Sequence, residues 1–215
     1  FEYFDVKKST LLGHSLGGHI VCWFAALYPD LVEKLIIVDG FGPPRSREGD
    51  DQQVFLQRHR QQVAMLKSLN SAGRSMSGFA EALNRFQQHN SKLDHVIASR
   101  IVEEGIRELE GGRVTWRWDP RVDMVWSTFS HTDSEGLYQQ IRCPTLVITG
   151  SEGLAYWSFK NNRLKDEQAW YKSELNRRVT LFEDATHVEI NGAGHMVQFD
   201  KPSELIATVS DFLQA

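Results

Sequence analysis

Near the start of the chain, at residues 11–18, stands the sequence LLGHSLGG, in which two glycines flank Ser15 at a distance of two residues. The apolar residues before it are typical of a buried strand over 9–12, and those after it predict a helix over 18–28. A sharp turn between the two holds its central residue in a strained conformation, so we expect side chains at positions 13 and 17 to collide with neighbouring backbone. The pattern therefore predicts that Ser15 projects from the end of a sheet. The backbone N–H of Leu16, at the helix N-terminus, would then be placed to donate to a developing oxyanion.

Further strands are predicted by short apolar runs between turn residues. KLIIVD at 34–39 and PTLVITG at 144–150 are rich in β-branched residues, as in strands buried on both faces of a parallel sheet. A shorter run at 186–190 leads into a glycine-rich loop that ends on His195, and Pro202 opens a final helix. Strand, crossover helix and strand make a right-handed unit, which places Asp39 at the carboxyl end of a strand, where such sheets keep their sites. The predicted fold class is α/β with a mostly parallel sheet.

The segment between the second and third predicted strands has a different character. Residues 41–142 are polar with helical periodicity, including one helical candidate over 54–69. An insertion of this length between strands is usually functional. We therefore predict a helical lid at 41–142 on an α/β core formed by 1–40 and 143–215. Its aromatic side chains either pack the lid on the sheet or wall an apolar pocket. The relevant residues are an apolar stripe of Leu93, Val96, Ile97 and Ile101, and an aromatic cluster of Trp116, Trp118, Trp126 and Phe129.

The overall composition fits a globular domain with a substantial core: 215 residues, 41% hydrophobic and 24% charged, with a net charge of −4. The mild acidity gives no reason to expect a nucleic-acid or membrane partner, and no apolar run approaches the roughly 18 residues of a membrane span. Cys22 and Cys143 fall in or beside predicted apolar elements, which favours free thiols and a cytoplasmic location. The oligomeric state is left open.

The order of the candidate residues matters as much as their identity. Ser15 near the start and His195 near the end follow the order of the α/β-hydrolases, with the acid between them. The chain resembles this superfamily over nearly all of its length outside the predicted lid. Within the superfamily, DPR at 119–121 and the EG loop at 152–153 look more like the serine hydrolase-like esterases than the lipases. The matching positions are GHSLGG at 13–18, Pro29, Val32, Leu35, Asp39, PTLVI at 144–148 and GAGHM at 192–196.

The resemblance implies roles for individual residues. Ser15 would be the nucleophile and His195 its general base, because a hydroxyl needs an adjacent base to attack at neutral pH. A nucleophilic serine also distinguishes the chain from haloalkane dehalogenases and epoxide hydrolases, which carry Asp there. Most family members carry the acid at the position of Gly153, so two alternatives stay open here. Glu152 lies one residue short but has a longer side chain, and we favour it over Asp39, at the end of the preceding strand.

The implied activity is hydrolysis of a carboxylic ester, or a related acyl bond, through an acyl-serine intermediate. The expected substrate is a small apolar acyl ester, and no metal or organic cofactor is expected. A carbon–carbon bond hydrolase or a lactonase uses the same triad, and a non-catalytic binding module is the third alternative.

One departure from the family concerns the N-terminal region. In the family, several strands and a His-Gly loop come before the strand that leads into the nucleophile turn, here the strand predicted over 9–12. That loop supplies the second oxyanion donor. Only fourteen residues precede Ser15 here, so we expect a sheet that lacks these strands and leaves an open edge. Losing one oxyanion donor costs on the order of a hundred- to a thousandfold in turnover. We therefore expect the isolated chain to be inactive and the activity to belong to the full-length protein.

Overall fold

The structure, a computed structural model, describes residues 1–45, 56, 60, 63–64, 75–119, 122, 125, 129–160 and 164–215, with the side chains of 159 and 160 excepted. Most of the predicted helix over 54–69 lies outside these residues, as do Trp126 and positions 120–121. The contacts divide the chain into two compact units. The first comprises residues 1–49 and 130–215, and the second comprises residues 50–129.

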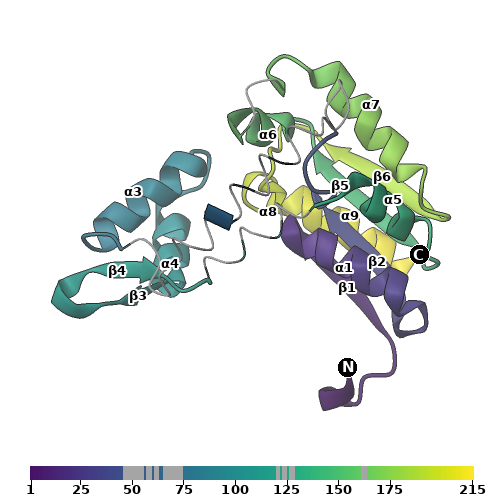
Figure 1. Ribbon diagram of the computed structural model, residues 1–215, viewed down its shortest axis with the longest axis horizontal. Coiled ribbons are helices and arrows are strands. Elements are labelled where there is room, and N and C mark those ends of the chain that lie inside the picture. Colours follow the sequence, from purple (N-terminus) through teal and green to yellow (C-terminus); the bar gives the residue numbers. More distant parts are fainter. Residues whose placement is uncertain are drawn as a thin grey trace. The chain divides into compact units, whose positions relative to one another are not determined.

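A parallel four-stranded sheet forms the centre of the first unit (Figure 1), in the order β1-β2-β5-β6. Residues 35–38 of β2 and all of β5 are buried, as their continuous apolar runs predict for strands covered on both faces. The predicted α/β fold with a mostly parallel sheet is confirmed. The strands are β1 (Ser9–His14), β2 (Val32–Val38), β5 (Thr145–Gly150) and β6 (Ala185–Ile190).

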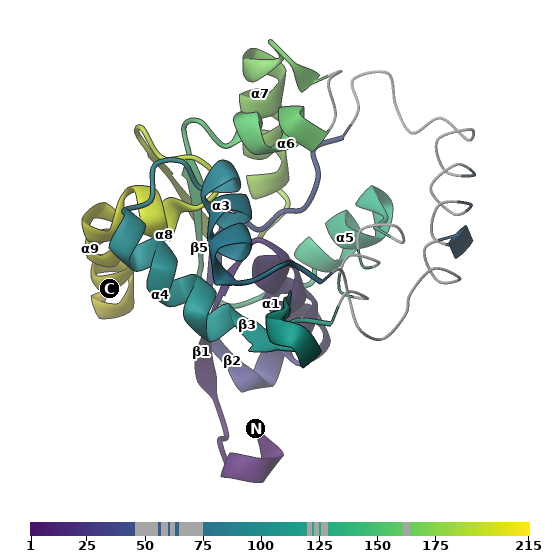
Figure 2. The same cartoon turned by 90° about the vertical axis from the view of Figure 1, so that its left-hand side faces the viewer.

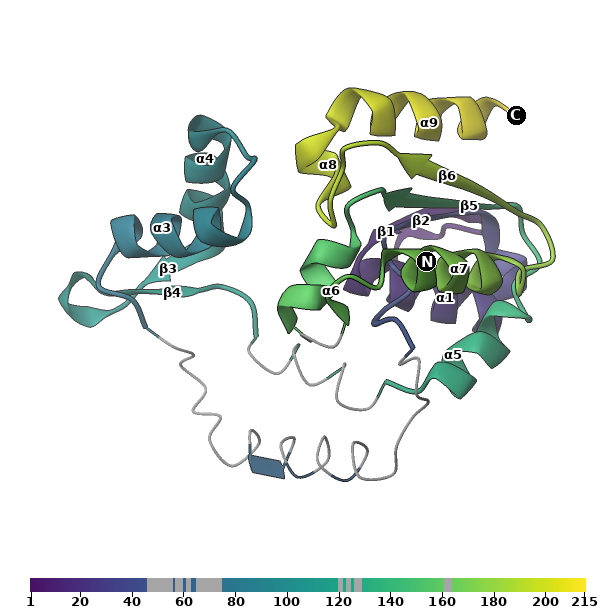
Figure 3. The same cartoon turned by 90° about the horizontal axis from the view of Figure 1, so that it is seen from above.

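Helices cover both faces of this sheet, with α1 and α7 on one side and α9 on the other (Figure 3). Successive side chains of β2 alternate between the two cores: Ile37 joins the α1 and α7 side, and Ile36 joins the α9 side. The helices of this unit are α1 (Leu16–Leu27), α5 (His131–Tyr138), α6 (Leu154–Lys160), α7 (Gln168–Val179), α8 (Val197–Asp200) and α9 (Pro202–Gln214).

Strand β1 lies at the edge of the sheet and pairs with β2. Leu12 on this strand is 53% exposed, and α1 also exposes a row of apolar side chains, Ile20, Trp23 and Leu27, at helical spacing. The opposite face of α1, which includes Cys22 and Ala25, is buried against the sheet. The first unit is therefore densely packed at β2 and β5 and carries exposed apolar side chains at β1.

The described part of the second unit contains two α-helices that pack on each other (Figure 2) and a short hairpin. The prediction of a helical lid did not include this hairpin, because strands of three residues are too short to show an alternating pattern. Gly111 and Gly112, both at positive φ, form its turn and were the available signal. The elements are α3 (Phe79–His89), α4 (His95–Gly105), β3 (Ile106–Glu108) and β4 (Val114–Trp116).

The division into units differs from the predicted boundaries at 41 and 142. Helix α5 falls inside the predicted insertion, yet it contacts α1 and belongs to the first unit. In the second unit Trp116 and Trp118 stack with their ring centroids 4.7 Å apart, and Trp118 is 53% exposed. Val96 and Ile97 of the predicted apolar stripe are exposed, whereas Leu93 is buried.

Among the residues that the structure describes, none of the helices combines the length and apolar character that crossing a bilayer requires. Cys22 is a buried free thiol and Cys143 a half-buried one.

Candidate active site

The turn between β1 and α1 has the predicted strained geometry. Ser15 has φ 52° and ψ −120°, in a region that residues other than glycine seldom adopt. Its N–H donates to the carbonyl of Val38 on the neighbouring strand, over 3.0 Å, which holds the turn against the end of the sheet. Leu16 begins α1, so its N–H lies in the first turn, where the helix itself supplies no acceptor. Both positions agree with the sequence prediction.

Of the two glycines that flank Ser15, one is needed for the reason predicted and the other is not. A β-carbon at Gly13 would lie 2.3 Å from the carbonyl oxygen of Gly17, a collision that confirms the expectation for position 13. At Gly17, however, a β-carbon would have nothing within 4 Å, so the expectation for position 17 was wrong. The close approach is instead between Gly18 and Gly40, because a β-carbon at Gly18 would lie 2.7 Å from the Gly40 Cα.

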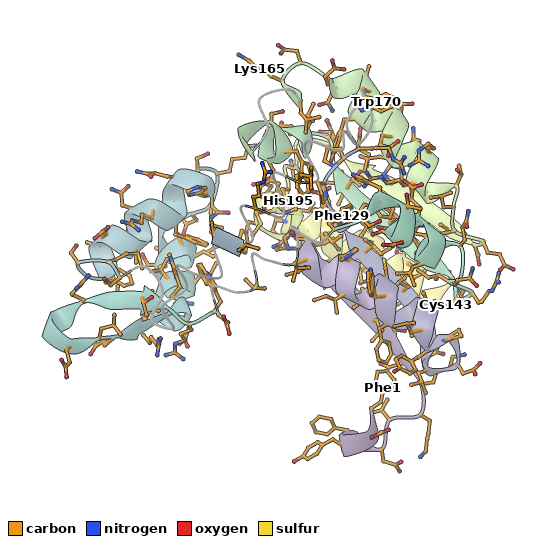
Figure 4. All side chains as sticks on the ribbon, in the orientation of Figure 1. Phe1, Phe129, Cys143, Lys165, Trp170 and His195 are labelled. Atoms are coloured by element: carbon orange, nitrogen blue, oxygen red, sulfur yellow. The ribbon has the colours of Figure 1, made fainter. Side chains whose placement is uncertain are left out.

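His195 joins the serine to a carboxylate. Its Nε2 lies 2.9 Å from Ser15 Oγ, and its Nδ1 lies 2.5 Å from Asp39 Oδ2. Because a carboxylate only accepts, Nδ1–H is the donor to Asp39, and in the neutral ring Nε2 is left to accept from the serine hydroxyl. The side chains of His195 and Asp39 are 5% and 3% exposed, so the pair is shielded from water. Figure 4 labels His195, which lies beside α6.

At the acid the structure departs from the preference drawn from the sequence. Asp39, the alternative, meets His195, whereas Glu152 is an exposed residue whose backbone N–H donates to the carbonyl of Ala193 over 2.8 Å. Asp39 has φ 43°, a left-handed conformation that Asp tolerates better than most residues. The available signal was position itself: Asp39 follows β2 directly, while Glu152 lies two residues beyond the end of β5.

The loop that carries His195 is held by contacts with the ends of β1 and β5. A β-carbon at Gly150 would lie 2.3 Å from the carbonyl oxygen of Ala193, so the loop rests on the end of β5 at a glycine. His14 Nε2 donates to the carbonyl of His195 over 2.8 Å. The N–H of Gly194 donates to Asp200 Oδ2 over 2.7 Å. These contacts fix the backbone on either side of the imidazole.

The other histidines of the sheet do not take the place of His195. His14 supports the loop through the bond just described, and burial lowers its pKa, which favours the neutral ring. His187 lies in β6 with its Nε2 2.9 Å from Thr149 Oγ1, and burial lowers its pKa as well. Of these three histidines, His195 is the one whose ring nitrogen lies 2.9 Å from Ser15 Oγ.

Aromatic side chains of α6 and α7 surround the histidine, and the sequence did not single out this arrangement. Tyr156 stacks on the His195 ring with centroids 3.9 Å apart and planes 16° from parallel. Trp157 meets the same ring edge-on at 6.2 Å. Burial raises the pKa of Tyr171, and the nearby charge of Asp39 adds to the effect. The three side chains shield the histidine and the carboxylate from water.

Across the described parts of the chain, no group of three or more His, Cys, Asp or Glu side chains is arranged to hold a metal ion.

The family model for the alpha/beta hydrolase fold matches residues 2–202. The chain belongs to the α/β-hydrolase fold family. The serine hydrolase-like protein of Danio rerio is 26% identical over 214 residues, which cover 99% of this chain and 63% of that protein. An esterase of Escherichia coli is 25% identical over 97% of this chain and 68% of its own length.

A solved structure gives the same relationship at the level of the fold. The crystal structure of an esterase from Mycobacterium tuberculosis is 27% identical and superposes with a TM-score of 0.60, covering 96% of this chain and 61% of that one. This α/β-hydrolase chain thus spans about two thirds of the length of these relatives.

Proposed function

We propose that this chain carries the catalytic centre of a serine hydrolase that cleaves carboxylic esters. The observation that carries the proposal is the continuous path from Ser15 Oγ to His195 Nε2 over 2.9 Å, and from His195 Nδ1 to Asp39 Oδ2 over 2.5 Å. Family membership and relatives named as esterases support the same reaction class. Asp39 is assigned as the acid, and the N–H of Leu16 as one oxyanion donor.

In the first half-reaction the Ser15 oxygen attacks the ester carbonyl while His195 Nε2 takes the hydroxyl proton. The carbonyl becomes a tetrahedral oxyanion, to which the Leu16 N–H donates. The bond to the alkoxy group then breaks, and the proton on Nε2 passes to the departing alcohol. An acyl group remains on Ser15, and Asp39 stabilises the imidazolium that forms in between.

In the second half-reaction a water molecule gives a proton to His195 Nε2 as its oxygen attacks the acyl carbon. The Ser15–acyl bond breaks and the serine recovers its proton from the imidazolium, so the net reaction is the hydrolysis of one ester bond. The step needs no metal or organic cofactor. In this scheme the second unit would serve as a lid, the role predicted for residues 41–142.

The test is turnover of p-nitrophenyl acetate and butyrate by the full-length protein, with fluorophosphonate labelling read by mass spectrometry. We expect labelling at Ser15, and a loss of turnover of roughly a million-fold in Ser15→Ala, the scale seen when a triad nucleophile is removed. Ser203→Ala, an exposed serine of α9, is the matched control and should leave both unchanged.

The remaining alternatives correspond to other outcomes of this experiment. Turnover of lactones or β-diketones with no turnover of linear esters would move the assignment to a lactonase or a carbon–carbon bond hydrolase. Absence of both turnover and labelling in a folded protein would contradict catalysis and favour a binding module.

A further inference from the structure

A buried arginine holds the segment that follows the catalytic acid. Arg178, in the last turn of α7, is 2% exposed and is among the largest fully buried side chains. Its Nη1 donates to the carbonyl of Phe41 over 3.2 Å, and its Nη2 to that of Pro43 over 3.0 Å. These carbonyls lie two and four residues beyond Asp39. The guanidinium thus binds the backbone immediately after the catalytic carboxylate.

Two further N–H groups of this guanidinium also have partners. Nε donates to Glu174 Oε1 over 3.0 Å, and Nη2 lies 3.2 Å from His131 Nδ1. Because an arginine only donates, His131 must accept at Nδ1, with its own proton on Nε2. Burial by itself favours the neutral acid at Glu174, but the hydrogen bonds and charges of Arg177 and Arg178 hold its pKa below the usual value. The buried cation therefore has a paired anion.

This set of partners suits an arginine and not a lysine. The guanidinium presents five N–H donors in a rigid plane, and here they reach two backbone carbonyls, a carboxylate and an imidazole at once. A lysine ammonium has three donors at a single point, so it cannot span the Phe41 and Pro43 carbonyls and Glu174 together. Pairing with Glu174 alone would not require this geometry.

Asp39 needs such support because its backbone is strained. At φ 43° a residue other than glycine persists only where the surroundings hold it in place. On the strand side, the Asp39 N–H donates to the carbonyl of Ile148 over 2.7 Å. On the far side, α7 supplies the hold: Arg178 binds at Phe41 and Pro43, and Trp170, labelled in Figure 4, donates its indole N–H to the carbonyl of Arg45 over 3.3 Å.

We propose that Arg178 is a positioning residue for the catalytic acid: by binding the carbonyls of Phe41 and Pro43 it keeps Asp39 in line with His195. The inference rests on the proposed function for its kinetic consequence and on the backbone contacts for its structural one. Displacing a catalytic group by about 1 Å can cost a hundredfold in rate. Loss of the Arg178 contacts should therefore lower kcat while leaving KM nearly unchanged.

The test compares two variants in the full-length protein. Arg178→Lys keeps the positive charge and loses the planar set of N–H donors. The double variant Arg178→Gln with Glu174→Gln removes both charges of the ion pair at once, so that no carboxylate is left buried and unpaired. We expect kcat for p-nitrophenyl butyrate to fall by roughly ten- to a hundredfold in both, with KM changed by less than about threefold. Arg177→Lys is the matched control, since the hydrogen bonds of Arg177 go to Glu174 and Glu135, whereas those of Arg178 also reach the Phe41 and Pro43 carbonyls.

Two readouts separate positioning from a general loss of stability. Each variant is combined with Asp39→Asn; if Arg178 acts through Asp39, the Arg178 effect on kcat disappears in that background. Proton NMR follows the His195 Nδ1–H signal, which a short bond to a carboxylate moves far downfield, and which the Arg178 variants should shift or broaden and Arg177→Lys should not.

The outcomes are distinguishable. If the fold-losses in kcat caused by the Arg178 and Asp39 substitutions multiply in the combined variant, and the His195 Nδ1–H signal is unchanged, the positioning role is overturned. Arg178 would then only stabilise the fold. Absence of ester turnover in the parent protein would contradict the proposed function alone, because the NMR comparison still tests whether Arg178 orients Asp39.

Discussion

The carboxyl ends of β2 and β5 lie side by side in the sheet. Each is followed by one of the two acidic residues that the sequence offers as the partner of His195. At the end of β2, Asp39 is buried, strained and bonded to His195 Nδ1. At the end of β5, Glu152 is exposed and contributes its backbone N–H to the loop that carries the histidine. The end of β2 thus supplies the carboxylate that contacts His195, and the end of β5 supports the loop that carries His195.

Gly153 explains how the two ends coexist. A β-carbon at this position would lie 3.4 Å from Asp39 Oδ1 and 3.2 Å from the Tyr171 hydroxyl. The space into which a side chain at position 153 would point is therefore already occupied by the Asp39 carboxylate and the tyrosine. The lack of a side chain at Gly153, after β5, therefore leaves room for the Asp39 carboxylate, after β2.

The largest effect is expected at the end of β2. Asp39→Asn should lower kcat for ester hydrolysis roughly a thousand- to ten-thousandfold, because an amide can hold the wrong imidazole tautomer and cannot stabilise the imidazolium. Steady-state kinetics with p-nitrophenyl butyrate measures the loss, and circular dichroism checks the fold. A loss of less than about tenfold in a folded protein would return the acid to Glu152.

A second variant asks whether the acid can move to the other strand end. Combining Asp39→Gly with Gly153→Asp vacates the first position and places a carboxylate beside it, and a glycine adopts the positive φ of position 39 without strain. We expect kcat to recover about ten- to a hundredfold over Asp39→Gly alone, which a restored imidazolium partner would explain. If the double variant folds without recovery, the geometry at the end of β2 is the one that catalysis requires.

A smaller change at the same position tests crowding without moving the charge. Gly153→Ala should lower kcat about tenfold and cost on the order of 1–2 kcal/mol of stability, because its methyl group presses on Asp39 and Tyr171. Gly136→Ala in α5 is the control, since a β-carbon there would have nothing within 4 Å. Kinetics and thermal unfolding of the pair measure the difference, and equal behaviour of the two variants would contradict the crowding argument.

The smallest effect is expected at Glu152. Glu152→Gln should change kcat by no more than about twofold, because the contact that supports the histidine loop comes from its backbone N–H and survives the substitution. The measurement is the same steady-state assay, run beside Asp39→Asn. A hundredfold loss of kcat in Glu152→Gln would contradict the assignment of different roles to Asp39 and Glu152.

Much of the fold was accessible from local pattern. The strands at 34–39 and 144–150 could be predicted because burial on both faces demands continuous apolar runs. The strained turn at Ser15 could be predicted from the glycines that flank it, and the serine-to-histidine order can be seen directly in the sequence. The hairpin at Gly111 and Gly112 was missed because its strands are shorter than any periodicity can mark. The collision assigned to Gly17 was misplaced because it depends on which backbone passes nearby, and that backbone belongs to Gly40, opposite Gly18.

The sequence by itself determined that Ser15 and His195 would stand at one edge of a parallel sheet, since each follows a predicted strand and the carboxyl ends of parallel strands meet at the same edge. Only the tertiary structure decided which acid reaches the histidine. That choice rests on the 2.5 Å contact between Asp39 Oδ2 and His195 Nδ1, and on the lack of a side chain at Gly153, whose β-carbon position lies 3.4 Å from the same carboxylate. Such contacts join residues far apart in the chain, so no local pattern encodes them.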